Sequence, residues 1–275
     1  MDTENYPGLS VEIEDQVATI KMLSPCDMTN DIAAKCELHW ELGRVFSDLR
    51  AENSVRVVVL TGVKEERFLA APFTSTYASQ AGRTWRNDPA RTWKVFTGIV
   101  RCHEAMVALE KPIVARVNGD AVGFGQSVMF SSDLIVAVKD ARVADIHMGM
   151  GEVEPYGPPY GIVPGDGGLA VVPLYMTPAK CKEYLMLAKE YSGEELAKMN
   201  IINYAVARAD LDRVVNDLVA RLLKRSAHAL AWTKRIANRN LVAHMNRTLD
   251  AGAAYEMVNL HQIELMNWTD RKTLE

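Results

Sequence analysis

Two short runs of apolar residues constrain the fold more than any other part of the sequence. Val55–Thr61 reads VRVVVLT and Pro112–Val117 reads PIVARV, and each run ends at glycine or Asn-Gly. Strands with so few polar positions are buried on both faces, as in parallel sheets covered by helices. Helical patterns precede each of them, over about Asn30–Leu49 and Pro89–Leu109. The alternation predicts an α/β layered domain with parallel pairing.

Weaker patterns surround these strands. Leu9–Ile13 and Val17–Met22 alternate apolar and polar residues around a polar turn, which predicts an antiparallel hairpin. Asn30 and Asp31 are suitable N-caps for the first long helix. The later elements are expected as a short helix at Gln126–Ser131, strands at Leu134–Val138 and Arg142–Ile146, and helices at about Asp210–Lys224, Ala227–Leu241 and Thr248–Asn267. We therefore expect an α/β core over residues 1–208 and a helical C-terminal region over residues 209–275.

Composition narrows the choice of partners. A net charge of −4 provides no basic stripe to neutralise phosphates, which argues against nucleic acid and favours a small-molecule partner. The N-terminus is acidic and polar, and no apolar run approaches the roughly 20 residues that a membrane span needs. The four cysteines show no CxxC pair or zinc spacing, so we interpret them as buried thiols and expect no metal. We expect a cytoplasmic protein.

Two glycine-rich turns are candidates for the chemistry. Val117–Gly125 follows a buried strand and precedes a short helix, so its backbone N–H groups and the helix N-terminus can face developing negative charge. This pattern predicts an oxyanion site, although a tight turn without a ligand is the alternative. Gly161–Gly168 is the second turn. Before it, residues 148–164 are rich in Gly, Pro and Tyr, which favours an ordered lid.

The segment Lys111–Ala137 carries a family resemblance. It reads KPIVARVNGDAVGFGQSVMFSSDLIVA and resembles the crotonase-like, or enoyl-CoA hydratase/isomerase, superfamily, whose pattern is KPxIAAxNGxAxGGGxxLxxxCDxxxA. The resemblance continues in order through Val57–Gly62, Gly161–Gly168 and Ala229–Lys234, so it covers most of the chain. It implies a spiral of ββα turns, a helical C-terminal region that forms trimers or dimers of trimers, and two backbone N–H donors that polarise a carbonyl.

Several positions depart from the hydratase pattern. Hydratases have a glutamate just after the glycine triplet, where this chain has Gln126-Ser127, and a second one where an ungapped alignment reaches Gly157. Glu152 and Glu154 lie in the loop nearby and are possible replacements. The first oxyanion donor falls near Pro72, which has no N–H, so Ala71 is the best candidate beside Phe124. These departures place coenzyme A binding in doubt.

A narrower resemblance centres on Asp166. The run GIVPGDG at Gly161–Gly167 is similar to the 6-oxocamphor hydrolase branch, whose members cleave a carbon–carbon bond of a cyclic β-diketone without coenzyme A. That branch also has a histidine on the first helix, a histidine before the glycine-rich motif, and a glutamate in the last helix. His39, His147 and Glu256 fill these places here. A further histidine of the branch, in the first glycine-rich turn, has no counterpart between Asn118 and Asp133.

The resemblance implies a division of labour at the site. Histidine has the pKa to take a proton from water near neutrality, and a carboxylate can orient it. We assign His147 as base, Asp166 as its partner, and Glu256 as a second carboxylate near the imidazole or water. His39 and the N–H groups of Phe124 and Ala71 are candidates for polarising the carbonyl. Protonated His147 or Asp166 is then expected to protonate carbon.

Each candidate also has a purely structural interpretation. Asp166 is a plausible cap for a helix near Gly167, His39 a plausible solvated helix residue, and Glu256 a plausible half of an intrahelical ion pair. The substrate contacts proposed from composition are Tyr156 and Tyr160, which with Phe124 suggest a bulky apolar substrate. Histidines without any such context are His103, His228, His244 and His261.

Three hypotheses follow. The first is a cofactor-free hydrolase of a β-diketone or related 1,3-dicarbonyl, based on Asp166 and its partners. The second is a coenzyme-A-dependent hydratase, isomerase or ring-opening enzyme that uses Glu152, Glu154 or Asp166 as its acid–base group. The third is a non-catalytic binding or assembly protein, suggested by Pro72 where an N–H donor is expected. Affinity for coenzyme A separates the first two, and activity of Asp166→Asn separates them from the third.

Overall fold

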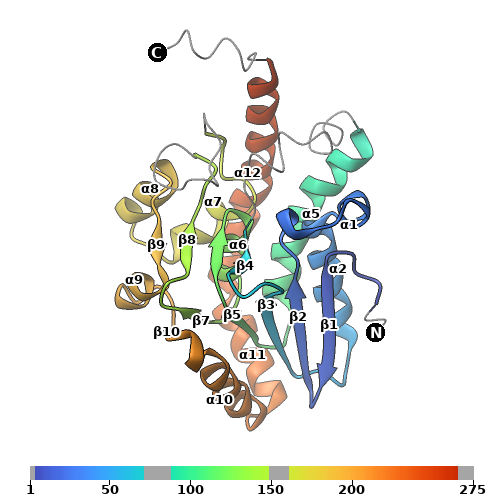
Figure 1. Ribbon diagram of the computed structural model, residues 1–275, viewed down its shortest axis with the longest axis vertical. Helices are drawn as coiled ribbons and strands as arrows, with labels where there is room; N and C mark the ends of the chain where they lie inside the picture. The colour runs from blue at the N-terminus through green and yellow to red at the C-terminus, as the bar shows by residue number, and fades with distance from the viewer. Residues whose placement is uncertain (1–3, 71–87, 149–160, 266–275) are drawn as a thin grey trace.

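The larger of the two sheets has six strands. The computed structural model describes residues 4–70, 88–148 and 161–265. The strands are β1 (Leu9–Glu14), β2 (Val17–Met22), β3 (Val57–Gly62), β5 (Ile113–Val117), β7 (Leu134–Val138) and β10 (Tyr204–Val206), in the order β1-β2-β3-β5-β7-β10. β1 pairs antiparallel with β2, and every other neighbouring pair is parallel (Figure 1). The hairpin and the parallel core are thereby confirmed.

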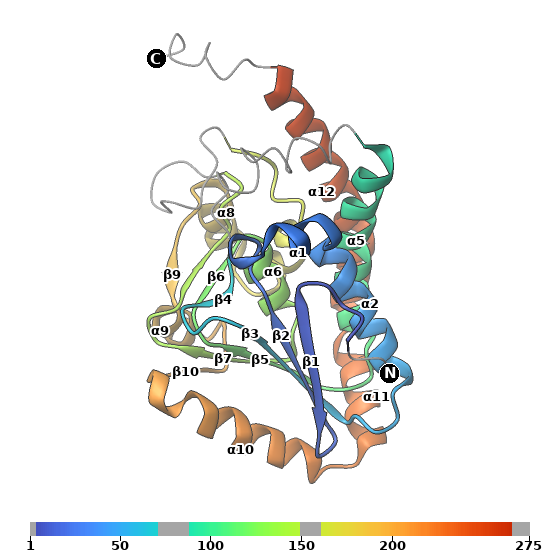
Figure 2. The same ribbon diagram turned by 45° about the vertical axis from the view of Figure 1, so that its right-hand side comes forward.

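The second sheet is smaller and has four strands. It contains β4 (Arg67–Leu69), β6 (Asp120–Val122), β8 (Arg142–Ala144) and β9 (Tyr191–Ser192) in that order. Three consecutive strands of the large sheet, β3, β5 and β7, each turn directly into a strand of the small sheet, β4, β6 and β8 (Figure 2). This repetition of two strands and a helix forms the predicted spiral.

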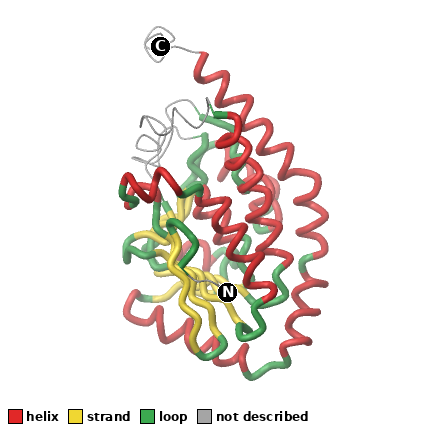
Figure 3. The backbone as a smooth tube through the Cα atoms, turned by 90° about the vertical axis from the view of Figure 1, so that its right-hand side faces the viewer, coloured by secondary structure: helices red, strands yellow, loops and turns green. Residues whose placement is uncertain are grey.

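Helices cover the sheets. In chain order they are α1 (Asn30–Lys35), α2 (Leu38–Ala51), α5 (Pro89–Ala108), α6 (Phe124–Phe130), α7 (Gly168–Val171), α8 (Pro178–Met186), α9 (Gly193–Lys198), α10 (Leu211–Leu223), α11 (Ala227–Ala237) and α12 (Arg239–Leu265), with 3-10 turns at Pro25–Asp27, Val172–Leu174 and Arg208–Asp210. Helix α10 packs across β3, β5 and β7, and α12 packs along α5 and α7. Figure 3 shows most of the helices on one side of the strands, while α10 lies below them. None of the helices in these ranges has the length and apolar character required to cross a bilayer.

The helix bounds differ from expectation at two places. The first predicted helix is divided at Cys36-Glu37, because Thr29 caps α1 and the Glu37 carboxylate caps α2 by accepting the Trp40 N–H at 2.8 Å. The cap residue is therefore Thr29 rather than Asn30 or Asp31. Helix α12 begins at Arg239, well before the predicted Thr248.

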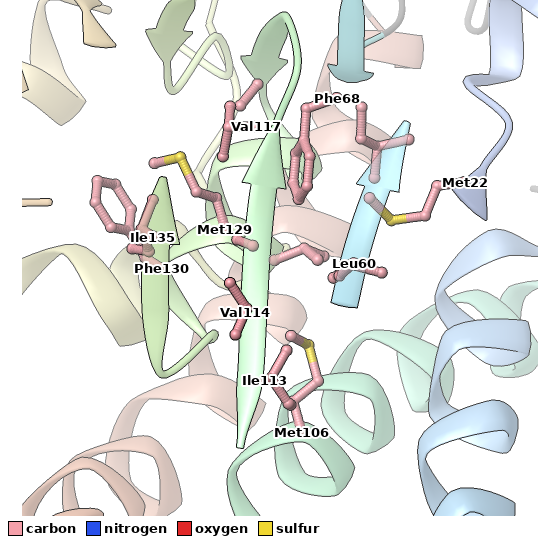
Figure 4. Packing of buried hydrophobic residues seen from close by; sticks show 14 of the residues in the cluster. Met22, Leu60, Phe68, Met106, Ile113, Val114, Val117, Met129, Phe130 and Ile135 are labelled. Atoms are coloured by element: carbon pink, nitrogen blue, oxygen red, sulfur yellow. The ribbon is translucent and has the colours of Figure 1, made fainter. Parts of the chain in front are cut away.

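The core fills the space between the large sheet and the helices. Fully buried side chains from strands and helices interdigitate there (Figure 4), among them Met22, Leu60, Phe68, Met106, Ile113, Val114, Met129 and Phe130. Cys102 and Cys181 are buried thiols as predicted. Cys26 is exposed and Cys36 is half-buried, so the expectation of burial was wrong for these two.

Buried Asn118 ties together the turns between the sheets. Its Oδ1 accepts the N–H of Gly62 at 3.0 Å, and its Nδ2 donates to the carbonyl oxygens of Lys64 and Arg67 at 2.6 and 3.2 Å. Close backbone approach completes the junction, because a Cβ on Gly125 would overlap the carbonyl oxygen of Leu69. Glycine is thus required where the end of β4 meets the start of α6.

Gly125→Ala should lower the free energy of unfolding by about 1–3 kcal/mol, the usual cost of overpacking a closely packed interior. The added methyl meets backbone that only a shift of β4 can move. Urea denaturation measures the effect. Gly252→Ala is the matched control, since a Cβ there has its nearest neighbour at 3.6 Å, an ordinary contact. A loss of stability as large in Gly252→Ala as in Gly125→Ala would contradict the account.

Candidate active site

Three buried carboxyl side chains meet around the imidazole of His147. Nδ1 of His147 lies 2.7 Å from Oδ1 of Asp145, while Nε2 lies 3.3 Å from Oδ2 of Asp166 and 3.8 Å from Oε1 of Glu256. Asp145 and His147 follow the end of β8, Asp166 precedes α7, and Glu256 projects from α12. Each of the four is at most 7% exposed. The structure therefore brings together three of the predicted residues, His147, Asp166 and Glu256. It adds Asp145, which was not predicted.

The second glycine-rich turn makes this convergence possible. A Cβ on Gly165 would lie 2.6 Å from Oε2 of Glu256, and a Cβ on Gly168 would overlap Oδ2 of Asp145. Gly167 has φ +110° and stands against the ring of His103. A side chain at Gly165 or Gly168 would displace a carboxylate, so these two glycines let α12 and the end of β8 approach Asp166.

Burial and mutual charge fix where the protons reside. Burial would lower the pKa of His147, but Asp166 and Asp145 raise it well above its ordinary value. Burial would raise the pKa of Asp166, but the charge on His147 lowers it. Burial raises the pKa of Glu256 to about 8, and Asp166 adds to this rise. Near neutrality the site then holds a charged His147, an ionised Asp166 and a protonated Glu256.

Glu256 should make stability depend on pH. Its folded pKa of about 8 exceeds the ordinary 4.5, so the native state holds an extra proton between these values and the free energy of unfolding falls as pH rises through that window. The raised pKa of His147 acts with the same sign above its ordinary 6.5. Urea denaturation across this range measures the slope. Glu256→Gln should flatten it, and an unchanged slope in that variant would contradict the assignment.

The first glycine-rich turn leads directly into the same cluster. Gly123 has φ +61°, and α6 starts at Phe124, whose N–H has no partner within its own helix because it lies in the first turn. Two residues in the first turn of α6, Gln126 and Ser127, contact the carboxylates. Gln126 Nε2 donates to Oδ2 of Asp145 at 3.2 Å, and Ser127 Oγ donates to Oδ1 of Asp166 at 3.4 Å. One helical turn thus links the oxyanion candidate to the acid cluster.

Two histidines flank Phe124. The ring of His39 lies 4.0 Å from the Phe124 ring, and Nδ1 of His39 lies 2.6 Å from Oε1 of Glu37. Burial would lower the pKa of His39, but Glu37 raises it. His103 is fully buried, with Nε2 3.0 Å from the carbonyl oxygen of Asp166. His103 has no catalytic context in the sequence pattern, and folding places it on α5 behind the second glycine-rich turn.

The structural alternatives for the predicted residues find no support. The N-cap of α7 is Gly167, without a side-chain cap from Asp166. His39 has only a fifth of its side chain exposed, and Glu256 faces His147 rather than a partner on its own helix. Other predicted positions lie outside the described residues, namely Ala71, Glu152, Glu154, Tyr156 and Tyr160, so their assignments stay predictions.

The cluster also has the spacing of a metal site. Asp145, His147 and Asp166 offer ligand atoms within 4.8 Å of one another. In the structure these atoms contact each other as ion pairs and hydrogen bonds. The expectation that no metal is needed stays a prediction.

Sequence comparison identifies relatives over nearly the whole chain. A family model described as enoyl-CoA hydratase/isomerase matches residues 12–265. A crotonyl-CoA hydratase of Syntrophomonas wolfei is 24% identical over 248 residues, which cover 90% of this chain and 88% of the relative. A carnitinyl-CoA dehydratase of Escherichia coli is 29% identical over 207 residues, which cover 75% of this chain and 72% of the relative.

Solved structures share the fold. An enoyl-CoA hydratase/isomerase from Mycobacterium paratuberculosis superposes with a TM-score of 0.77 at 23% identity and covers 92% of this chain and 93% of its own. A β-diketone hydrolase from Anabaena, bound to (S)-3-oxocyclohexyl acetic acid, superposes with a TM-score of 0.78 at 18% identity. That match covers 95% of this chain and 97% of the other.

Proposed function

The chain belongs to the enoyl-CoA hydratase/isomerase family, and we propose that it hydrolyses a carbon–carbon bond of a cyclic β-diketone or related 1,3-dicarbonyl. The observation that carries this proposal is the placement of Nε2 of His147 between Asp166 and Glu256, at 3.3 and 3.8 Å. A charged imidazole, an ionised carboxylate and a protonated carboxyl at one point provide the groups needed to activate water and to deliver a proton.

The proposed reaction starts with water. The His147–Asp166 pair takes a proton from water, whose oxygen attacks one ring carbonyl while the Phe124 N–H stabilises the oxyanion. Collapse of the tetrahedral intermediate breaks the bond to the carbon between the two carbonyls, and the electron pair moves onto the second carbonyl as an enolate. Glu256, which carries a proton below about pH 8, then protonates the enolate carbon. The product is a keto acid. The proton that the His147–Asp166 pair took from water then passes to Glu256, so the reaction consumes one water and leaves the protein in its starting state.

The resting ion pair predicts how the rate varies with pH. Because the pKa of His147 is raised well above its ordinary value, the pair must lose its own proton before it can accept one from water. The rate is therefore expected to rise with pH as His147 deprotonates and to fall where Glu256 loses its proton. Asp166 acting alone as base would give no rising limb near neutrality.

The ligand of the Anabaena neighbour fits this product class. (S)-3-Oxocyclohexyl acetic acid is a keto acid. Formal closure of such a molecule by loss of one water, with a bond from the carboxyl carbon to a carbon beside the ketone, gives a bicyclic 1,3-diketone. We therefore choose bicyclic and 2-substituted cyclic 1,3-diketones as the first substrates to test.

The names of the sequence relatives favour a second candidate, a coenzyme-A-dependent hydratase. The two residues that follow the glycines of the first turn, Gln126 and Ser127, argue against a hydratase. Gln126 and Ser127 are fully buried and donate to Asp145 and Asp166, so neither supplies the acid of a hydratase. Glu152 and Glu154 stay alternative acid–base groups for this candidate.

One experiment separates the two candidates. The purified protein is incubated in parallel with the diketones and with crotonyl-CoA, and the products are followed by chromatography. We expect keto acids from the diketones, no hydration of crotonyl-CoA and no binding of coenzyme A. Hydration of crotonyl-CoA with no turnover of any diketone would reverse the proposal, and Asp166→Asn with wild-type activity on both would favour the non-catalytic alternative.

We further propose that the protein assembles as a homotrimer or a dimer of trimers. Large apolar side chains are exposed on α11 and α12, namely Trp232 (60%), Ile236 (62%), Tyr255 (66%) and Val258 (57%). A contact between copies would remove this apolar surface from water. Sedimentation equilibrium should return a mass three or six times that of one chain, and Trp232→Glu should lower it. A wild-type mass of one chain would contradict the assembly.

A further inference from the structure

One carboxylate of the cluster has no role in the proposed reaction. The side chain of Asp145 is fully buried, and Oδ1 faces Nδ1 of His147, on the side of the ring away from Asp166 and Glu256. The same oxygen accepts the backbone N–H of His147 at 3.1 Å. Asp145 thus contacts Nδ1 of the imidazole, while Nε2 is directed toward Asp166 and Glu256.

The second oxygen of Asp145 also has a hydrogen-bond partner. It accepts Nε2 of Gln126 at 3.2 Å, and a Cβ on Gly168 would overlap it. The orientation of the Gln126 amide is itself fixed, because Nε2 lies 2.8 Å from Ser127 Oγ and Oε1 accepts the Tyr184 hydroxyl at 3.4 Å. A carboxylate bound at both oxygens cannot rotate away from the imidazole.

We infer that Asp145, held by Gln126, is a positioning residue that keeps the proton of His147 on Nδ1 and directs Nε2 toward Asp166 and Glu256. This inference rests on the proposed function for its kinetic consequence only. The pair Gln126-Ser127 stands where hydratases of the resembled family have a glutamate. Here both residues are donors, to Asp145 and Asp166 respectively, and a glutamate at position 126 would place a carboxylate beside Oδ2 of Asp145 and repel it.

The test measures the tautomer of His147. If Asp145 only supported the turn, its substitution would leave that tautomer unchanged. Full-length protein labelled with ¹⁵N-histidine is titrated by NMR, and the neutral imidazole in wild type is expected to keep its proton on Nδ1. In Asp145→Asn the loss of one carboxylate should populate the Nε2–H tautomer and lower the pH at which the ring loses its charge. On the diketone, kcat should fall about 100-fold with KM changed less than threefold.

Two further variants separate positioning from folding. Gln126→Leu removes the donor yet keeps Asp145, and it should shift the same NMR signals in the same direction. Asp133→Asn is the matched control, because Asp133 is a largely buried carboxylate that accepts the Ile113 N–H and pairs with Lys234 away from the site. It should leave the His147 signals unchanged even if it lowers stability.

The outcomes are distinct from those that test the function. An Nδ1–H tautomer retained in both Asp145→Asn and Gln126→Leu overturns the inference. Shifted tautomers in a protein that turns over no diketone would sustain the positioning role and refute the proposed reaction.

Discussion

Asp166→Asn is expected to reduce kcat on the diketone about 1000-fold, within the range of about 10²–10⁴ that general acid–base groups contribute. Asparagine preserves the shape of the side chain but carries no negative charge to hold a proton taken from water. Because Asp166 pairs with Nε2 of His147 at 3.3 Å, the variant also removes one of the two carboxylates that raise the pKa of His147. Steady-state kinetics on the best diketone measures the effect.

Asp133→Asn is the control for this variant. It makes the same chemical change at a buried ion pair, with Lys234 at 2.7 Å, outside the candidate site. We expect lower stability without a large change in kcat. If Asp166→Asn retained kcat within threefold of wild type, Asp166 would be a structural residue and the His147–Asp166 pair would not be the proton acceptor.

His147→Gln is expected to lower kcat by about 10³–10⁴, because it removes the only imidazole in the described cluster that contacts Asp166 and Glu256 through a side-chain nitrogen. The variant should also lose the rising limb of the pH–rate profile. Initial rates at several pH values give both results. Low temperature keeps the protein folded, since the change leaves buried carboxylates without their cation.

The double variant His147→Gln, Asp166→Asn tests whether the two residues act as one unit. Groups that work together lose their joint contribution when either is removed, so the double variant should be only slightly slower than the slower single variant. Multiplication of the two single effects would show that the residues act independently, and would contradict a shared role in taking the water proton.

The sequence predicts the strands of the core well, because hydrophobic periodicity and apolar content are properties of short segments of the chain. The hairpin Leu9–Glu14 and Val17–Met22 and the buried strands β3 and β5 appear within two residues of their predicted bounds. The division of the first helix was missed because the cap of α2 is the Glu37 carboxylate. Glutamate is not among the residues that usually mark a helix start, so the pattern contained no sign of it.

The site was predicted in part, and the reasons are physical. His147, Asp166, Glu256 and His39 were named from motif order, which folding then brings to one place. The contact of His103 with the turn before α7 cannot be predicted from its position on α5, because the two segments meet only on folding. Asp145 is not among the predicted residues, although residues two apart at the end of a strand share one face and Asp145 precedes His147 by two.

The departures from the hydratase pattern now have a structural account. Gln126 and Ser127 are donors that hold two carboxylates, and a glutamate in this pair would repel them. The residues that stand in place of the hydratase glutamate thus hold the carboxylates of the His147 cluster in position. This is a physical reason to favour hydrolysis of a carbon–carbon bond over hydration of a double bond.

The most direct measurement uses a diketone labelled with ¹³C at one ring carbonyl and at the carbon between the two carbonyls. ¹³C NMR during incubation with wild-type protein reports the bond itself. The account predicts that the ketone signal is replaced by a carboxylate signal and that the one-bond coupling between the labelled carbons disappears. Retention of that coupling, in a preparation that hydrates crotonyl-CoA, would contradict the proposed reaction.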